Sequence, residues 1–131
     1  MTCLILNLGC ECQTIVISLK NGALLHQSER QGIYQRAEKV NGKTSWISSN
    51  SEALWYNAVS DDWVIGSVEN LGANIGGITS NVNQRKSCPY NVPNDAWKYV
   101  ANSSWIIADA NDVSIECLTD FGNLGIYMFL S

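Results

Sequence analysis

The sequence is poor in charge and in histidine, and it has no long hydrophobic run. Charged residues make up 15% of the 131 residues, whereas roughly a quarter is usual in globular domains. The net charge of −4 argues against nucleic acid or an anionic membrane as a partner, because clustered Lys and Arg would be needed to neutralise phosphates. No stretch approaches the roughly 18 apolar residues of a membrane-spanning helix. We therefore expect no nucleic-acid partner and no membrane insertion.

The motifs of catalysis and of cofactor binding are missing as well. The glycines from Gly72 to Gly77 lack the Lys-Ser/Thr that completes a phosphate-binding loop. The single histidine, His26, lies in a polar stretch, so a Cys-His nucleophile pair is not expected. Acids for a glycoside hydrolase site are available, but no spacing selects a pair among Glu29, Glu38, Glu52, Glu69 and Glu116. We expect no catalytic residue and no resident cofactor, calcium aside.

Five cysteines without a C-x-x-C pair favour disulfides over a zinc site. Cys10 and Cys12 are one residue apart and cannot easily bridge each other in an extended strand. We expect them to pair with Cys88 and Cys117, in an order that the sequence leaves open. Cys3 is left over. Disulfides indicate an extracellular protein, although residues 1–9 fall short of a signal peptide; we expect a module of a longer secreted protein, or a chain that lacks its true start.

Short alternating segments and turn dipeptides predict an all-β fold. Ile15, Ile17 and Leu19 alternate with polar neighbours as in a half-buried strand, and Asn21-Gly22 and Asn41-Gly42 predict tight turns. Fourteen Asn and fourteen Ser residues suit a turn-rich protein, since both bond to the nearby backbone. Nothing sustains a helical period, although residues 23–31 could hold one helical turn. We expect about eight or nine short antiparallel strands in a sandwich or a partly closed barrel.

Two segments match each other at an offset of 42 residues, and each predicts a Trp-rich β-hairpin. The first runs from Leu54-Trp55-Tyr56 to Trp63-Val64-Ile65, and the second from Trp97-Lys98-Tyr99 to Trp105-Ile106-Ile107. The repeat predicts that Trp55 is equivalent to Trp97 and Trp63 to Trp105, with most of each indole buried.

The domain is expected to run from residue 10 to residue 117, because a cysteine lies near each end. Residues 1–9 and 118–131 are then terminal extensions, the latter forming an added edge strand or a non-native continuation. The longest irregular segment, residues 81–94, holds both prolines and Cys88, which is placed to pin it.

The candidate site residues are aromatic, acidic and amide side chains. We expect ligand contacts from Tyr90, on the long loop, and from Trp46, Tyr34 and Tyr99; the alternative for Tyr90 is that it covers one end of the core. Calcium could bind acids that lie in or after the two hairpin turns, namely Asp61, Asp62, Asp109 and Asp112, which are also common turn formers. Asn102 begins an N-glycosylation acceptor at the second hairpin turn.

The spaced motifs of the chain resemble those of a small module that recurs in multidomain extracellular proteins of invertebrates. They are Gly32-x-Tyr34, Asn41-Gly42-Lys43 before Trp46, Trp55-Tyr56, Trp63-x-Ile65-Gly66 and the pair Trp97 and Trp105, framed by Cys12 and Cys117. The resemblance implies an extracellular, non-enzymatic domain beside other domains. We therefore expect a recognition or adhesion module that binds carbohydrate or an extracellular protein, the alternatives being a small secreted hydrolase with a carboxylate-based site and a purely structural matrix domain.

Overall fold

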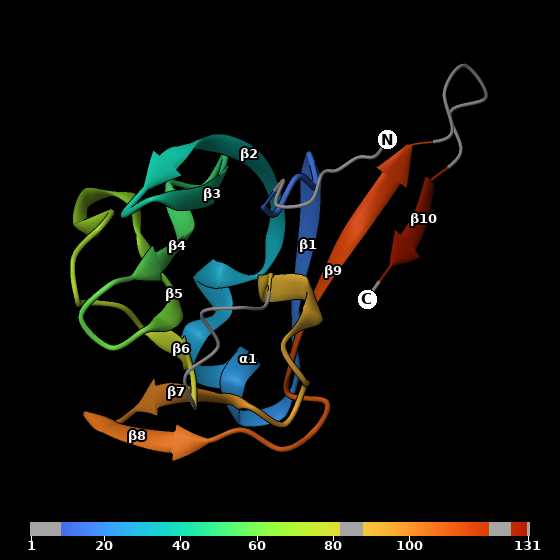
Figure 1. Cartoon of the computed structure of the whole chain (residues 1–131). Helices are drawn as coiled ribbons and strands as arrows, with labels where there is room; N and C mark the ends of the chain where they lie inside the picture. The colour runs from blue at the N-terminus through green and yellow to red at the C-terminus, as the bar shows by residue number, and fades with distance from the viewer. Residues whose placement is uncertain (1–8, 82–87, 121–126, 131) are drawn as a thin grey trace, which may run out of the picture.

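One curled antiparallel sheet forms most of the protein (Figure 1). The computed structural model describes residues 9–81, 88–120 and 127–130. The strand order is β10-β9-β1-β2-β3-β4-β5-β6-β7-β8, and every neighbouring pair is antiparallel. The strands are β1 Thr14–Leu19, β2 Gly32–Val40, β3 Lys43–Ser48, β4 Glu52–Asn57, β5 Asp62–Ser67, β6 Ile78–Ser80, β7 Trp97–Ala101, β8 Ser104–Ile107, β9 Val113–Asp120 and β10 Tyr127–Leu130. The predicted all-β, partly closed architecture is confirmed.

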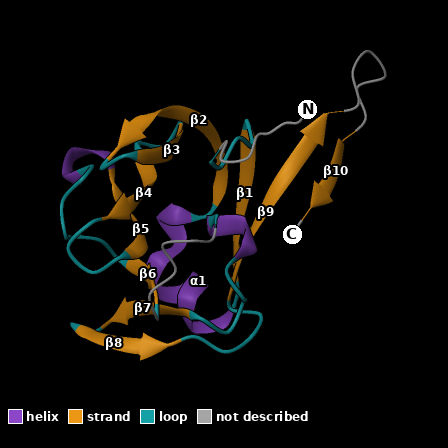
Figure 2. Ribbon diagram, viewed as in Figure 1, coloured by secondary structure: helices purple, strands orange, loops and turns teal. Residues whose placement is uncertain are grey.

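Three short helical segments lie within the curl of the sheet, namely α1 Asn21–Gln27, η1 Ser28–Arg30 and η3 Pro89–Asn91, whereas η2 Val68–Asn70 lies on its outer side (Figure 2). The tight turn predicted at Asn21-Gly22 is wrong: α1 begins there, and Asn21 adopts a positive φ of 53°. Helix α1 packs against β7, where the Gln27 amide donates to the Val100 carbonyl at 2.8 Å. Helix α1 also contacts β1, so it fills the space between β1 and β7 on the inner side of the sheet.

The inner face of the sheet holds one aromatic core. Ile15, Ile17 and Leu19 are all buried in it, which confirms the predicted alternation of β1. The largest side chains in this core are Trp46, Trp63, Trp97 and Tyr34, each fully buried. A second, smaller cluster of Ala53, Trp55 and Val64 lies on the opposite, outer face. Strand β4 is therefore buried on both faces.

The second turn dipeptide forms the turn that its sequence predicts. Asn41 and Gly42 connect β2 to β3 with positive φ angles of 54° and 85°, as a tight hairpin turn requires. The Asn41 amide also donates to the carbonyls of Tyr56 and Gly72, at 2.8 and 3.1 Å. The turn thus holds the neighbouring hairpin and loop in place.

Two disulfides join the ends of the chain to the core. Cys10 is bonded to Cys88 and Cys12 to Cys117, with Cα–Cα distances of 5.5 and 5.9 Å. The predicted pairing of the two N-terminal cysteines with the two distant ones is confirmed, and its order is now resolved. Cys3 lies outside the described residues. Such bonds persist in an oxidising environment of the extracellular type.

The sheet continues past the last of these cysteines. Strand β9 runs to Asp120, and β10 pairs with it from Tyr127↔Asp120 to Leu130↔Cys117. The tail thus contributes an added edge strand, one of the two possibilities that the sequence left open, and it brings the sheet to ten strands within the described ranges. Within the long irregular segment, residues 82–87 lie outside the described ones, and Pro89–Asn91 forms η3.

Candidate functional site

Three of the four aromatic residues expected at a binding surface lie in the core. Trp46 and Tyr34 have no exposed surface, and Tyr99 is 6% exposed. The Trp46 indole N–H donates to the Cys12 carbonyl at 2.8 Å, and the Tyr34 hydroxyl donates to the Arg30 carbonyl at 2.7 Å. These internal bonds satisfy the polar atoms that a surface aromatic would offer to a ligand, so the expectation of exposure was wrong for this group.

Tyr90 is half-buried rather than freely exposed. Its ring packs edge-on against Trp46, with 6.1 Å between the ring centroids, and it contacts the main core. Burial raises the pKa of its phenol. These contacts agree with the alternative interpretation, in which Tyr90 covers one end of the core.

The two Trp-rich hairpins exist, but they present opposite faces to the core. In the first, Trp63 points inward and Trp55 lies on the outer face. In the second, Trp97 is fully buried in the main core, whereas Trp105 is 47% exposed. Trp63 therefore corresponds to Trp97 as the inward-facing residue, and Trp55 to Trp105 as the outward-facing one, which reverses the expected equivalence.

The two hairpins differ in which face meets the core. Both turns have an even number of residues, four between the paired Asn57 and Asp62 and two between Ala101 and Ser104, so the two tryptophans of each hairpin lie on opposite faces of the sheet. Directly opposed residues share a face of the sheet, so Trp105, opposite Val100, points to the same side as Lys98. The outer cluster covers Trp55, but β8 is an edge strand exposed along its whole length.

The exposed indole lies at a pocket on the outer face. The pocket has a volume of about 190 Å³ and is formed by β5, β6, β7 and β8 together with the β4–β5 turn and the loop before β6. It is lined by Asn57, Ser60, Asp62, Val64, Asn74, Ile75, Gly76, Thr79, Lys98 and Trp105. Sequence reasoning singled out Asp62 among these, as a calcium ligand, and counted Trp105 as buried.

One wall of the pocket depends on close contact between two glycines. Gly66 in β5 and Gly76 in the loop lie so close that a Cβ on Gly66 would be 3.0 Å from the Gly76 Cα. A Cβ on Gly76 would meet the Val64 side chain and lie 3.0 Å from the Ile65 carbonyl oxygen. The Trp55 indole N–H anchors the same loop by donating to the Ala73 carbonyl at 3.0 Å. The glycine-rich segment thus builds a wall against β5 and is no phosphate loop.

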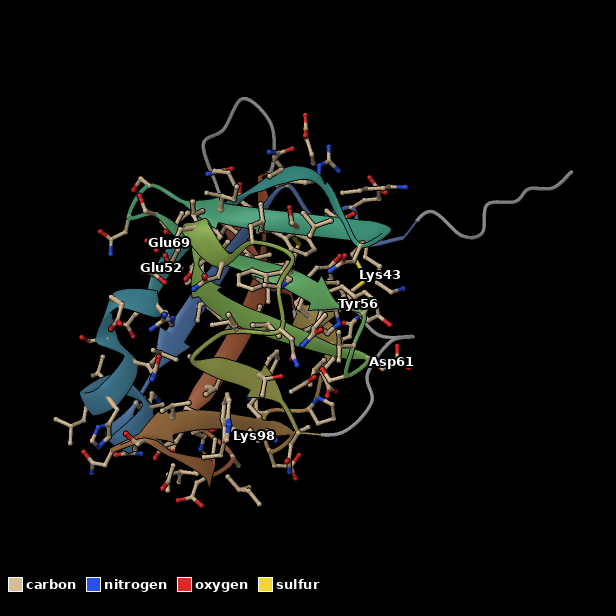
Figure 3. The ribbon with its side chains drawn as sticks, turned by 90° about the vertical axis from the view of Figure 1, so that its left-hand side faces the viewer. Lys43, Glu52, Tyr56, Asp61, Glu69 and Lys98 are labelled. Carbon is tan, nitrogen blue, oxygen red and sulfur yellow. A yellow bond between two sulfur atoms is a disulfide. The ribbon has the colours of Figure 1, made fainter. Side chains whose placement is uncertain are left out.

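The pocket lining includes one carboxylate, that of Asp62, and one ammonium group, that of Lys98. The Asp62 carboxylate accepts a hydrogen bond from the Ser80 hydroxyl at 2.9 Å. Burial raises the pKa of Asp62 above its usual 3.8, although the Ser80 hydrogen bond and the Lys98 charge oppose the shift. The Lys98 ammonium lies 5.2 Å from the centroid of the Trp105 ring, a cation–π contact. Figure 3 shows Lys98 on β7 and, at the end of the β4–β5 hairpin, Lys43, Tyr56 and Asp61 close together.

Two asparagine amides close the pocket at the hairpin end. Asn57 is buried, and its amide nitrogen donates to the side-chain oxygen of Asn74 while its own oxygen accepts from the Val59 N–H at 3.0 Å. The exposed Asn74 uses its oxygen in this bond. Its NH₂ group makes no hydrogen bond within the described residues, which leaves two donors for solvent or a ligand.

The four acids considered as calcium ligands lie in two separate turns. Asp61 accepts a hydrogen bond from the Tyr56 hydroxyl, and Asp112 is buried and accepts from the Asn21 amide at 2.8 Å and from the Asp109 N–H at 3.2 Å. Among the described residues, no three His, Cys, Asp or Glu side chains are grouped so that they could share a metal ion.

The remaining residues considered for catalysis or glycosylation are the cysteines, two glutamates and Asn102. Four of the five cysteines are disulfide-bonded, so none of these four can act as a thiolate. Glu29 and Glu52 both contact Arg30, at 2.8 and 3.2 Å, and burial raises the pKa of Glu52. Asn102 is exposed at the tip of the β7–β8 hairpin. Within the described part of the chain, no helix is long and apolar enough to span a membrane.

The chain matches no protein-family model, no curated protein and no solved structure.

Proposed function

We propose that this protein is a non-enzymatic, extracellular carbohydrate-binding module that holds a sugar ring in the pocket beside Trp105. The observation that supports the proposal most is that an indole 47% exposed lies on a pocket lined by amide, hydroxyl, carboxylate and ammonium groups. An indole stacks against the apolar C–H face of a pyranose, and polar groups at the ring edge bind its hydroxyls.

The polar groups of the pocket match the hydrogen-bonding needs of a neutral sugar. Asn74 and Lys98 offer donors, whereas Asp62 offers acceptor lone pairs beyond those used by Ser80 and Ser60. Sugar hydroxyls both donate and accept, so a mixed set suits them better than a set of one sign. At about 190 Å³ the pocket is smaller than the roughly 300–1,000 Å³ typical of drug-sized ligands. We therefore expect it to hold one sugar ring with a Kd on the order of 1 mM.

The same pocket argues against the hydrolase alternative. Retaining glycosidases need two carboxyl groups about 5 Å apart, and inverting enzymes need them about 6.5–9.5 Å apart. The lining contains one carboxylate, Asp62, and the Glu29–Arg30–Glu52 cluster lies outside it. The two disulfides support the extracellular setting, and the resemblance to a module of multidomain extracellular proteins supports a location beside other domains.

A glycan array followed by titration tests the proposal. The native chain should bind a subset of glycans equally well with added calcium and with a chelator. Trp105→Ala should weaken binding of the selected sugar by about tenfold or more with little change in melting temperature. The matched control is Leu25→Ala, since Leu25 is 77% exposed on α1, outside the pocket lining. Native affinity in Trp105→Ala, or no glycan bound by the native chain, would overturn the proposal.

A further inference from the structure

Strand β8 is an unprotected sheet edge with apolar side chains. Among the residues that the structure describes, it is the last strand of the sheet and pairs with β7 alone. Trp105, Ile106 and Ile107 are 47%, 41% and 66% exposed. Proteins usually protect such edges with Lys, Pro, a bulge or a covering segment, and the sequence Ser-Trp-Ile-Ile of β8 contains no charged residue and no proline.

The backbone pattern shows which groups face the free edge. The Ala108 N–H bonds to the Trp97 carbonyl at 2.9 Å, so even-numbered residues of this strand direct their backbone groups toward β7. By the same alternation, Trp105 and Ile107 direct their N–H and C=O groups away from the sheet. These are the groups that another strand would pair with.

We propose that a second copy of this chain pairs with this edge, so that β8 lies antiparallel to β8 of its partner about a two-fold axis. With Ile106 at the axis, Trp105 of each copy faces Ile107 of the other, and both outward-facing residues form hydrogen-bonded pairs. This register gives four intermolecular hydrogen bonds, and only apolar side chains oppose each other along it. Registers that centre on Trp105 or Ile107 pair only one outward-facing residue within the strand. The other would face Ser103, which lies in the turn with a positive φ of 67°, or Asp109, which lies beyond the end of β8.

The dimer would extend the proposed function without depending on it. Trp105 and Ile107 point to the outer face, so the two pockets of a dimer would lie on one continuous sheet surface and could bind two sugars of the same glycan. The shared strand is short, however, and standard interfaces bury about 1,600 Å². We expect a dimer with a Kd on the order of 10–1,000 μM, which mass measurements across that range will resolve.

Light scattering with size-exclusion chromatography tests the pairing. The native chain should move from 14.4 kDa toward twice that mass as concentration rises, and so should an Asn102→Gln variant, which cannot carry a glycan at the hairpin tip. Ile107→Lys should stay monomeric, because a charged side chain, Lys above all, on an edge strand blocks pairing with another strand. Ile107→Pro should do the same, because it removes an outward N–H that β7 does not use. Leu25→Lys, at a position on α1 that is 77% exposed, should dimerise like the native chain.

Cysteine cross-linking tests the register itself. Opposed residues of a non-hydrogen-bonded pair have Cα atoms about 4.5 Å apart, within disulfide reach. In a Cys3→Ser background, Ile106→Cys should therefore form a covalent dimer on mild oxidation, and Ile107→Cys should form several-fold less. A monomeric mass at every concentration, open-ended masses beyond the dimer, or equal cross-linking at 106 and 107 would overturn the proposal. Because sugar binding is measured separately, its absence would leave these results unaffected.

Discussion

Replacing Trp63 and Trp105 separately by Ala compares two tryptophans that occupy matched positions of the sequence repeat. Trp63 is fully buried and contacts two aromatic rings, Trp46 and Tyr56, at centroid distances of 6.2 and 5.9 Å. Removing a buried Trp costs about 3–5 kcal/mol, and each aromatic pair adds about 0.5–1.5 kcal/mol beyond its buried area. We therefore expect Trp63→Ala to lose about 4–5 kcal/mol of unfolding free energy, a large part of the roughly 5–15 kcal/mol typical of a domain.

Trp105→Ala should be far less costly. The residue is 47% exposed, and its cation–π contact with Lys98 is worth about 0.5–1 kcal/mol at an exposed site. A total loss near 1 kcal/mol is expected, at least about 3 kcal/mol less than for Trp63.

Urea unfolding followed by far-UV circular dichroism, with both disulfides intact, measures the two losses. The midpoint should shift strongly for Trp63→Ala and weakly for Trp105→Ala at an unchanged slope. Trp63→Phe, which keeps an aromatic ring, should lie between the native protein and Trp63→Ala and provides a folded variant if the alanine form does not accumulate. Equal losses at the two positions would refute the reversed orientation of the hairpins.

Three further predictions concern the bridges, the pocket wall and the partly buried Asp62. Replacing both cysteines of either disulfide by Ser should lower the free energy of unfolding by about 4–5 kcal/mol in the chain-entropy model, since both bridges close long loops. Non-reducing peptide mapping should recover the two observed pairs, and other pairs would contradict the fold. Gly76→Ala should lower the free energy of unfolding by about 1–3 kcal/mol, because its Cβ overpacks against Val64, and it should bind sugar more weakly. Wild-type stability and binding in this variant would contradict the close packing of the wall. Burial raises the pKa of Asp62 above its usual 3.8, so the protonated carboxyl group is favoured in the folded state. Its contribution to the free energy of unfolding is complete below the usual pKa of 3.8 and disappears as pH rises through the raised value. The melting temperature of Asp62→Asn relative to wild type should therefore increase between about pH 3 and pH 7, and a constant difference would contradict the shift.

The sequence was a good guide where local chemistry determines the structure. Ile15, Ile17 and Leu19 alternate with polar residues, and their burial followed directly from the two-residue period of a strand. The Asn41-Gly42 turn follows from two residues that tolerate a positive φ. The bridges could be reduced to two alternatives, because two cysteines one residue apart cannot easily pair with each other.

The site could not be located because it depends on which face of each hairpin meets the core. The repeat aligned the tryptophans by their spacing, but β4 buries Leu54 and Tyr56 in the main core, whereas β7 buries Trp97 and Tyr99. One signal was present: Lys98 between Trp97 and Tyr99 indicates that these two rings point inward and Lys98 outward. A two-residue turn at Asn102 and Ser103 would then have placed Trp105 on the side of Lys98.

Burial by distant segments accounts for the remaining errors. Trp46 and Tyr34 were expected at the surface, yet they are buried among side chains from other strands of the curled sheet. Trp55 faces outward and is buried because the loop before β6 lies against it. Such coverage depends on contacts between residues far apart in the sequence, which local periodicity does not report.

The indole N–H resonances of the protein offer the most direct test of the central claim, that Trp105 binds a sugar. The five tryptophans give five such signals in a ¹H–¹⁵N spectrum, and Trp105→Phe identifies the one in the pocket. On titration with a sugar selected by the array, the Trp105 signal should shift most and should saturate with the same Kd as the backbone signals of Asn74 and Thr79. Saturable sugar binding that leaves the Trp105 signal unmoved would contradict the account.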